Sequence, residues 1–362
     1  MTDSFPISRR SGFIGLAAAS LSIGQLFLGC SAAPAVTQDV KSAEPAAPVT
    51  KSEVEPEAVA PSAPPEPPAP TPPKVQILAD VGFAVPEAAL HDQAHDVYLV
   101  SNINGAPLDK DDNGFISRIT PEGEIDLKFI DGADESVELH APKGLAIIDD
   151  TLYVADIDVV RLFQLESGKP LGTLTFDKAR FLNALAKGPK NELYVSDTGI
   201  DSSFQSAGAE AIYVVEEGKI EKLASGVELA APNGVLASGA GVWVVTFGAD
   251  QLYEITAKGQ RKQDQTLPGK QLDGIVVDQR GRLLISSWEK GAIFAGNPGK
   301  DFVPVVTGLD APAAIGYDAK RDRILIPLFM KNQVLLHDLA DEGIPPKEAT
   351  PQAATPAPSQ ND

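Results

Sequence analysis

Six positions of the chain share a local pattern, in which one residue precedes a Gly or Ala and a short aliphatic run. These positions are Glu87, Lys143, Asn183, Asn233, Asp273 and Ala313. Five of the six are polar, although each begins an otherwise apolar segment. Carboxylate and side-chain carbonyl oxygens are the ligands that hard cations such as Ca²⁺ take in proteins. Four of these residues, Glu87, Asn183, Asn233 and Asp273, would therefore supply oxygen ligands to one divalent cation if the fold brings them together.

A second interpretation of the same positions needs no metal. Polar residues that line a channel also satisfy hydrogen bonds to water or to each other. The ammonium group of Lys143 would neutralise Glu87 or Asp273 directly. The residue types alone leave both interpretations open.

The elements that carry these positions form an internal repeat. Each unit has two aliphatic runs joined by a turn, and a third run follows in most units. The six units are spaced by 56, 40, 50, 40 and 40 residues, with room for excursions at 106–114 and 198–210. This period is typical of four-stranded propeller blades. We predict an all-β fold, a six-bladed β-propeller over residues 75–340, whose innermost strands bring the six positions to one height around the axis.

The order of several short motifs resembles that of a known family. The motifs are Pro86-Glu87, Phe181-Leu182-Asn183, Pro232-Asn233-Gly234, Leu272-Asp273-Gly274 and the Leu-Tyr-Val-x-Asp strands that end at Asp156 and Asp197. The region 75–340 is similar to the senescence marker protein, gluconolactonase and luciferin-regenerating enzyme family, with the paraoxonases and strictosidine synthases as more distant relatives. This resemblance implies a six-bladed propeller with a divalent cation, commonly Ca²⁺, near the top of the channel.

The resemblance also implies roles for individual residues. Glu87, Asn233 and Asp273 would hold the metal, and Asn183 would be a further ligand or would contact bound water or substrate. Enzymes of this family usually hydrolyse lactones or related esters, with the cation acting as a Lewis acid. Asp273 would then act as the general base for the attacking water. We therefore expect a small lactone or ester as substrate.

The sequence departs from the family pattern at several places. Asn183 is followed by Ala184 where related enzymes often have an acid, and Lys143 stands where some relatives use histidine. His140 and Arg180 precede two of the ring positions, and we expect Arg180 in the channel ring, where it would orient an anionic or hydroxylated substrate. A strand entrance also commonly carries Arg as a surface charge.

The remaining residues exclude other chemistry. The net charge of −20 argues against nucleic-acid binding, which relies on clustered Lys and Arg. No Ser lies in a Gly-x-Ser-x-Gly context and the single cysteine lies before the repeats, so ordinary covalent hydrolase chemistry is not expected. Trp243 and Trp288 lie in strand patterns, and we assign both to the core or to stacking between blades.

The ends of the chain have a different texture. Residues 1–30 have a basic start, an apolar stretch and a lipobox-like Phe-Leu-Gly-Cys end, which predicts a lipoprotein signal with Cys30 as the acylated residue. Residues 31–74, which include twelve prolines, predict a disordered tether, and 341–362 a disordered tail. The export route, by the general or the twin-arginine pathway, stays open.

Two functions follow from these observations. The first is a divalent-metal-dependent hydrolase of the lactonase type, a monomer anchored to the membrane of a bacterial envelope through Cys30. Ser31 gives no inner-membrane retention signal of the Asp type, so the outer membrane or periplasm is favoured in a Gram-negative cell. The alternative is a non-catalytic propeller that serves as a tethered module for binding a ligand or a protein.

Overall fold

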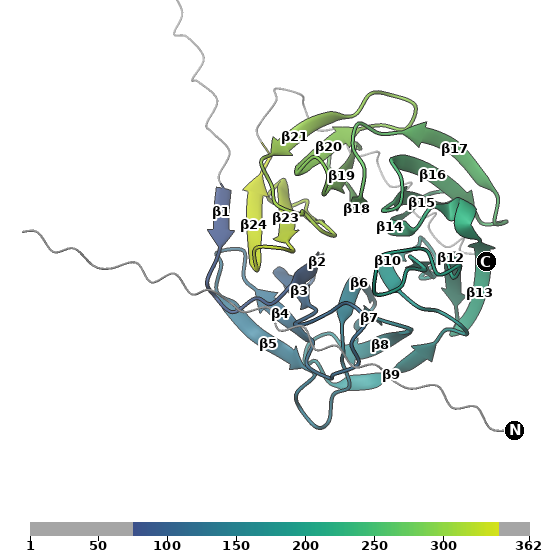
Figure 1. Ribbon diagram of the computed structural model, residues 1–362. Helices are drawn as coiled ribbons and strands as arrows, with labels where there is room; N and C mark the ends of the chain where they lie inside the picture. The colour runs from purple at the N-terminus through teal and green to yellow at the C-terminus, as the bar shows by residue number, and fades with distance from the viewer. Residues whose placement is uncertain (1–74, 340–362) are drawn as a thin grey trace, which may run out of the picture. The chain divides into compact units, whose positions relative to one another are not determined.

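The computed structural model describes residues 75–339 of the chain. These residues form six antiparallel sheets of four strands each, and one short 3-10 helix, η1 (Val227–Leu229). Figure 1 shows the sheets as blades around a central axis, with β2, β6, β10, β14 and β18 innermost. The predicted six-bladed, all-β propeller is therefore confirmed.

Five of the blades are built from four consecutive strands each. The first two blades are β2 (Pro86–Asp92), β3 (Val97–Asn102), β4 (Phe115–Ile119), β5 (Ile125–Asp131), and β6 (Pro142–Ile148), β7 (Thr151–Asp156), β8 (Val159–Gln164), β9 (Pro170–Thr175). The next two are β10 (Leu182–Lys187), β11 (Leu193–Asp197), β12 (Ala211–Glu216), β13 (Lys219–Ser225), and β14 (Pro232–Ala237), β15 (Gly241–Thr246), β16 (Gln251–Thr256), β17 (Arg261–Thr266). The fifth is β18 (Leu272–Val277), β19 (Leu283–Ser287), β20 (Ala292–Gly296), β21 (Val303–Thr307).

The sixth blade closes the ring with strands from both ends of the described chain. Its members are β22 (Gly316–Asp318), β23 (Arg323–Leu328), β24 (Gln333–Asp338) and β1 (Val75–Leu78). The first strand pairs with the last, from Val75 opposite His337 to Leu78 opposite Val334. This pairing covers the edge of β24, which would otherwise present unpaired backbone groups.

The hydrophobic core lies between the blades. Each of the six main clusters of buried apolar side chains draws its members from two neighbouring blades, and together they run once around the ring. Each blade is thus held by its two neighbours. No helix within residues 75–339 is long and apolar enough to cross a membrane.

The innermost strands share an irregularity at the positions singled out in the sequence. In β2, β6, β10, β14 and β18 the pairing with the next strand is regular at the first residue, shifts over the following two, and resumes at the fourth. A bulge of this kind re-aims a side chain out of the ordinary alternation of a strand. It falls on Glu87, Lys143, Asn183, Asn233 and Asp273, and so accounts for a polar residue at the start of each apolar strand.

The small residue after each ring position permits close packing of the inner strands. A Cβ atom placed on Gly144 would lie 2.3 Å from the carbonyl oxygen of Asn183, and one on Gly234 would lie 2.2 Å from that of Asp273. Between the last blade and the first, Ala314 donates its N–H to the carbonyl oxygen of Glu87 at 2.9 Å. The recurring Gly or Ala is therefore needed because the backbone of the next blade occupies the space of a larger side chain.

Candidate metal centre

The five polar ring positions meet at one cavity, at the end of the axis where the inner strands begin. Glu87, Lys143, Asn183, Asn233 and Asp273 all line this cavity, whose volume is about 30 Å³. We call it the ring cavity. Its remaining lining comes from loops and strand ends of the blades: Ile103, Pro107, Phe181, Thr198, Ile200, Phe204, Phe247, Trp288 and Phe329. Polar side chains from five blades therefore converge within an otherwise apolar and aromatic enclosure.

Buried carboxylates fix the loops that lead into the ring positions. Asp197, at the end of β11, accepts hydrogen bonds from the backbone N–H groups of Phe181 (2.9 Å) and Arg180 (3.0 Å), just before Asn183. Asp156, at the end of β7, accepts one from Ala141 at 2.8 Å, just before Lys143. These are the aspartates of the two Leu-Tyr-Val-x-Asp motifs, which thus act as anchors for the neighbouring strand.

The orientation of the Asn183 side chain follows from its partners. Thr198 donates its hydroxyl hydrogen to the carbonyl oxygen of Pro232 at 2.9 Å. The same hydroxyl oxygen therefore accepts a hydrogen bond, which comes from the Asn183 amide nitrogen at 3.0 Å. The Oδ1 atom of Asn183 is left without a hydrogen-bond partner in the protein.

Four ring oxygens are buried and unpartnered. They are Oε2 of Glu87, Oδ1 of Asn183, Oδ1 of Asn233 and Oδ1 of Asp273. A buried polar atom without a partner costs about 1–3 kcal/mol, so four in one cavity are a large penalty unless a ligand offsets it. Two carboxylates and two amide carbonyls are the ligand types that Ca²⁺ takes, so the residues fit a divalent cation.

The pKa values of the two carboxylates, Glu87 and Asp273, also favour a bound cation. Burial, and then the charge of Asp273, raise the pKa of Glu87 well above its ordinary value, while Lys143 opposes the rise. Burial also raises the pKa of Asp273 to about 7, against the influence of the neighbouring Trp288 and Asn233 side chains. The protein alone therefore disfavours two negative charges here, and a bound divalent cation would reverse this preference.

Lys143 does not neutralise these carboxylates by direct contact. Its ammonium donates hydrogen bonds of 2.8 Å to the carbonyl oxygens of Pro107 and Ala141 and lies 4.7 Å from the centre of the Phe181 ring. No ion pair within 4.0 Å joins it to Glu87 or Asp273 in the described part of the chain. Lys143 therefore acts on Glu87 through its charge and not through a direct ion pair, and the metal-free interpretation, in which Lys143 neutralises an acid, keeps only this longer-range interaction.

Two residues considered from the sequence lie elsewhere. Arg180 does not line the ring cavity: its side chain is exposed, and only its backbone N–H is held, by Asp197. The expectation that it joins the channel ring is thus corrected, because the anchored loop turns it to solvent. His140 is also outside the cavity lining, and its ring accepts a hydrogen bond from the backbone N–H of Asp112 at 3.0 Å.

The sequence analysis did not predict that aromatic side chains line the ring cavity. Trp288, which we assigned to the core or to stacking between blades, lines the ring cavity, and its ring lies 5.4 Å from Phe247 and 4.9 Å from Phe329. Its buried indole N–H makes no hydrogen bond of standard geometry, although it lies close enough to Asp273 to lower the pKa of that carboxyl. Their position in the repeat is the sequence feature that could have revealed them. Each directly follows the second strand of a blade, as Phe247, Trp288 and Phe329 do.

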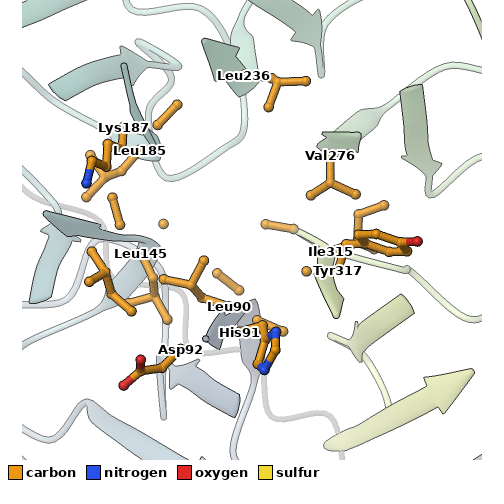
Figure 2. A pocket seen from close by; sticks show the side chains of 18 of the residues that line it. Leu90, His91, Asp92, Leu145, Leu185, Lys187, Leu236, Val276, Ile315 and Tyr317 are labelled. Atoms are coloured by element: carbon orange, nitrogen blue, oxygen red, sulfur yellow. The ribbon is translucent and has the colours of Figure 1, made fainter. Parts of the chain in front are cut away.

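A wider channel of about 790 Å³ begins directly below the ring and follows the inner strands toward their ends. Figure 2 shows aliphatic side chains from all six blades around it: Leu90, Leu145, Leu185, Leu236, Val276 and Ile315. Polar residues such as Asp92, Lys187 and Tyr317 come from the later residues of those strands. The channel has no convergent set of oxygen ligands comparable to the ring.

One further cluster, at that later end, has metal-like composition. His91, Asp96 and Asp318 place potential ligand atoms within 4.8 Å of one another. Arg321, however, donates to Asp96 at 2.7 Å and to Asp318 at 2.8 Å. Tyr98 donates to Asp318 at 2.7 Å. The acids are already neutralised, so we assign this cluster to the seam between the first and last blades.

Comparison with known proteins identifies the fold of this chain. The chain matches no family model, and no curated protein matches its sequence. A gluconolactonase from Xanthomonas campestris is similar in structure, with a TM-score of 0.57 and 14% identity over 74% of this chain and 90% of that one. A calcium-binding protein, regucalcin, from Agrobacterium tumefaciens has a TM-score of 0.54 and 15% identity over 73% and 93%.

A luciferin-regenerating enzyme has a TM-score of 0.54 and 13% identity, over 73% of this chain and 95% of that one. A streptogramin B lyase also has a TM-score of 0.54, with 12% identity over 74% and 98%. Each of these chains is covered almost completely, which indicates that the whole propeller is shared. At such identities the likeness establishes the fold, and the structural neighbours are the group of propellers that the sequence motifs resemble.

Proposed function

We propose that this protein is a divalent-cation-dependent hydrolase of lactones or related esters. The observation that carries the proposal is the set of four unpartnered oxygens from Glu87, Asn183, Asn233 and Asp273 in one buried cavity. Two structural neighbours support it, since one is described as a gluconolactonase and another as a calcium-binding protein.

The roles of the residues follow from their chemistry. The four oxygens would hold the cation, which when bound supplies Lewis acidity toward an ester carbonyl. Asp273 would accept a proton from the attacking water. Thr198 keeps the Asn183 amide oriented. One water is consumed: its oxygen bonds to the carbonyl carbon, the ring C–O bond breaks, and the released alkoxide takes a proton to give a hydroxy acid.

The size of the ring cavity sets which ligands fit inside it. At about 30 Å³ the cavity has room for an ion with its water. Phe204 is the rim side chain most open to solvent, at 46% exposure, in the long loop between β11 and β12.

The anchor remains part of the proposal. Residues 1–74 and 340–362 lie outside the described residues, and with them Cys30, the tether and the tail. We propose that Cys30 is acylated and holds the propeller, as a monomer, at the bacterial envelope. Membrane fractionation of a Cys30→Ala variant is the test, and recovery of that variant in the membrane fraction would contradict the anchor.

The metal site is tested by ligand linkage. Adding Ca²⁺ to the metal-free protein should raise its melting temperature, because a ligand that binds only the folded state stabilises it by about 2.7 kcal/mol at 100 times its dissociation constant. Asp273→Ala should abolish this rise, whereas Glu135→Ala, which removes an exposed acid away from the ring, should keep it. An equal rise in wild type and Asp273→Ala would place any bound cation elsewhere.

Hydrolysis is tested next on the Ca²⁺-loaded protein, with a panel of sugar and aliphatic lactones. Turnover that disappears in Asp273→Ala supports the hydrolase. A Ca²⁺-dependent rise in stability without turnover of any lactone would instead favour the non-catalytic binding module.

A further inference from the structure

The wide channel below the ring has no part in the proposed reaction. Its volume of about 790 Å³ lies within the range of small-molecule pockets, about 300–1,000 Å³. The ring cavity, at about 30 Å³, has room for an ion with its water. The channel is therefore large enough to hold an organic molecule of its own.

The wall of the channel is hydrocarbon through all six blades. The residue after each ring position lines it, and none of these six has a polar side chain: Ala88, Gly144, Ala184, Gly234, Gly274 and Ala314. The same strands then add six aliphatic side chains, which are Leu90, Leu145, Leu185, Leu236, Val276 and Ile315 (Figure 2). A belt of apolar side chains thus surrounds the axis between the ring and the far ends of the strands.

Part of this apolar belt is accessible to solvent. Leu90, Leu236 and Val276 are only half-buried, although they belong to innermost strands. Water filling the channel would amount to roughly 25 molecules, at about 30 Å³ each. Because an aliphatic wall offers such water no hydrogen bonds, its replacement by a hydrocarbon ligand is favourable.

The mouth of the channel, where the inner strands end, is polar. Two of its acids are buried and already paired: Asp92 lies 2.7 Å from the ring of His95, and Asp278 accepts from Arg282 at 2.9 Å. Four other lining residues are exposed, and within residues 75–339 their side chains make no hydrogen bond or ion pair: Gln93, Asp150, Lys187 and Gln279. Donors and acceptors are therefore both available at the mouth, as a hydroxylated head group requires.

We propose that this channel is a binding site for an amphiphile, with an aliphatic chain along the axis and a hydroxylated head group at the mouth. The depth suits a chain of intermediate length, since the five residues 88–92 of β2 span roughly 17 Å at about 3.4 Å per residue. The site is separate from the ring cavity, and it does not depend on the proposed hydrolase activity.

A plain solvent channel is the alternative. Such a channel would hold polar solutes as readily as amphiphiles, and the length of a hydrocarbon chain would not change the affinity. In an apolar site, each added methylene group that leaves water should raise the affinity by about three- to fourfold. The dependence of affinity on chain length is therefore the measurement that separates the two roles.

The experiment is calorimetric titration of the full-length protein with maltose, hexyl maltoside and decyl maltoside, each maltoside below its micelle-forming concentration. One decyl maltoside should bind per protein, on the order of 100-fold more tightly than hexyl maltoside, and maltose should not bind measurably. Val276→Asp places a charge in the apolar belt and should weaken decyl maltoside binding by about tenfold or more. Val303→Asp is the matched control, since Val303 is 54% exposed on β21, the outermost strand of the same blade.

Equal affinities for the two maltosides would overturn the proposal, and so would a Val276→Asp protein that binds decyl maltoside as wild type does. Binding of several molecules per protein would mean adsorption to the surface and would also contradict the site. Melting curves establish that each variant is folded, and Leu236→Asn, on the neighbouring blade, repeats the test should Val276→Asp fold poorly. Since no Ca²⁺ is added, the result does not depend on whether the metal site exists.

Discussion

Two buried aspartates of this propeller illustrate opposite uses of a carboxylate. Asp318 accepts hydrogen bonds from Tyr98 (2.7 Å), Arg321 (2.8 Å) and the backbone N–H of Lys320 (2.8 Å). Burial acts to raise the pKa of Asp318, but these donors hold it below its ordinary value. Asp273, by contrast, keeps an unpartnered oxygen, and burial raises its pKa. The first residue holds the ring closed, and the second is available to a ligand.

This contrast predicts a pH-dependent stability for the seam. A lowered pKa in the folded state contributes stability that is present above the unfolded value, about 3.9, and is lost as pH falls through the folded value. Asp318→Asn should therefore cost about 2–3 kcal/mol at pH 7, the range for hydrogen bonds to a charged group. The difference in unfolding free energy between Asp318→Asn and wild type should become smaller below about pH 4.

Denaturant unfolding of both proteins at pH 7, 5 and 3 measures this deficit. Asp310→Asn, an exposed acid that pairs only with the exposed Lys331, is the control and should stay within about 0.5 kcal/mol of wild type. A deficit for Asp318→Asn of the same size at pH 3 and pH 7 would mean that the charge of Asp318 is not what stabilises the seam.

At the residue scale, recurrence identified the ring but not its supports. Asn183 and Asp273 were predicted from one repeated position, since equivalent positions of a propeller converge on the axis. Thr198, which orients Asn183, follows the second strand of its blade as Phe247 and Trp288 do, but it was not predicted, because the residue type at that position changes from blade to blade. The prediction for Arg180 was wrong because its loop is turned by hydrogen bonds that Asp197 accepts from the backbone, and such contacts between residues far apart in the chain are not visible in the local sequence.

At the scale of the element, the inner strand depends on the small residue after its ring position. Gly234 in β14 lies against the backbone of β18, and a Cβ there would meet the Asp273 carbonyl oxygen at 2.2 Å and the Val245 side chain at 2.9 Å. Gly234→Ala should destabilise the protein by about 1–3 kcal/mol, the usual cost of overpacking. It should also weaken Ca²⁺ binding, because Asn233 and Asp273 flank the contact.

Thermal unfolding and Ca²⁺ titration of this variant check both effects. Gly239→Ala is the matched control, since a Cβ on Gly239 has nothing within 4 Å. A Gly234→Ala protein as stable as the control would show that the inner strands have room to separate, and the proposed reason for the repeated Gly or Ala would be wrong.

The sequence predicted the two inner strands of most blades better than the outer ones. Inner runs such as Leu182–Lys187 and Leu193–Asp197 are continuous apolar segments between turns, and the structure has both as strands. Outer strands such as Arg261–Thr266 are largely polar, because one face meets solvent. The inner strand of the last blade, expected near Ala313, is only Gly316–Asp318. Ala313 still bonds to Pro327 of its own blade, but Ala314 exchanges backbone hydrogen bonds with Glu87 and Ala89 of the first blade.

For the molecule as a whole, stability is distributed around a closed ring. Every main core cluster joins two neighbouring blades, so each blade depends on both neighbours and the loss of one interface opens the circle. The sequence predicted closure in general terms. It did not predict that Val75–Leu78, directly after the predicted tether, completes the last blade, because a strand of four residues carries little signal.

Closure by β1 makes a final prediction. A protein that begins at residue 80 lacks Val75–Leu78 and leaves β24 as an uncovered edge. It should lose several kcal/mol of stability, from backbone hydrogen bonds of about 1 kcal/mol each and the burial of Leu78, about 2 kcal/mol. It should also associate through the free edge at high concentration. A protein that begins at residue 71 keeps β1 and should unfold at the wild-type temperature. Melting curves and light scattering of the two truncations decide the matter: equal melting temperatures would show that the ring is held by the inter-blade cores alone, with β1 only an attached strand.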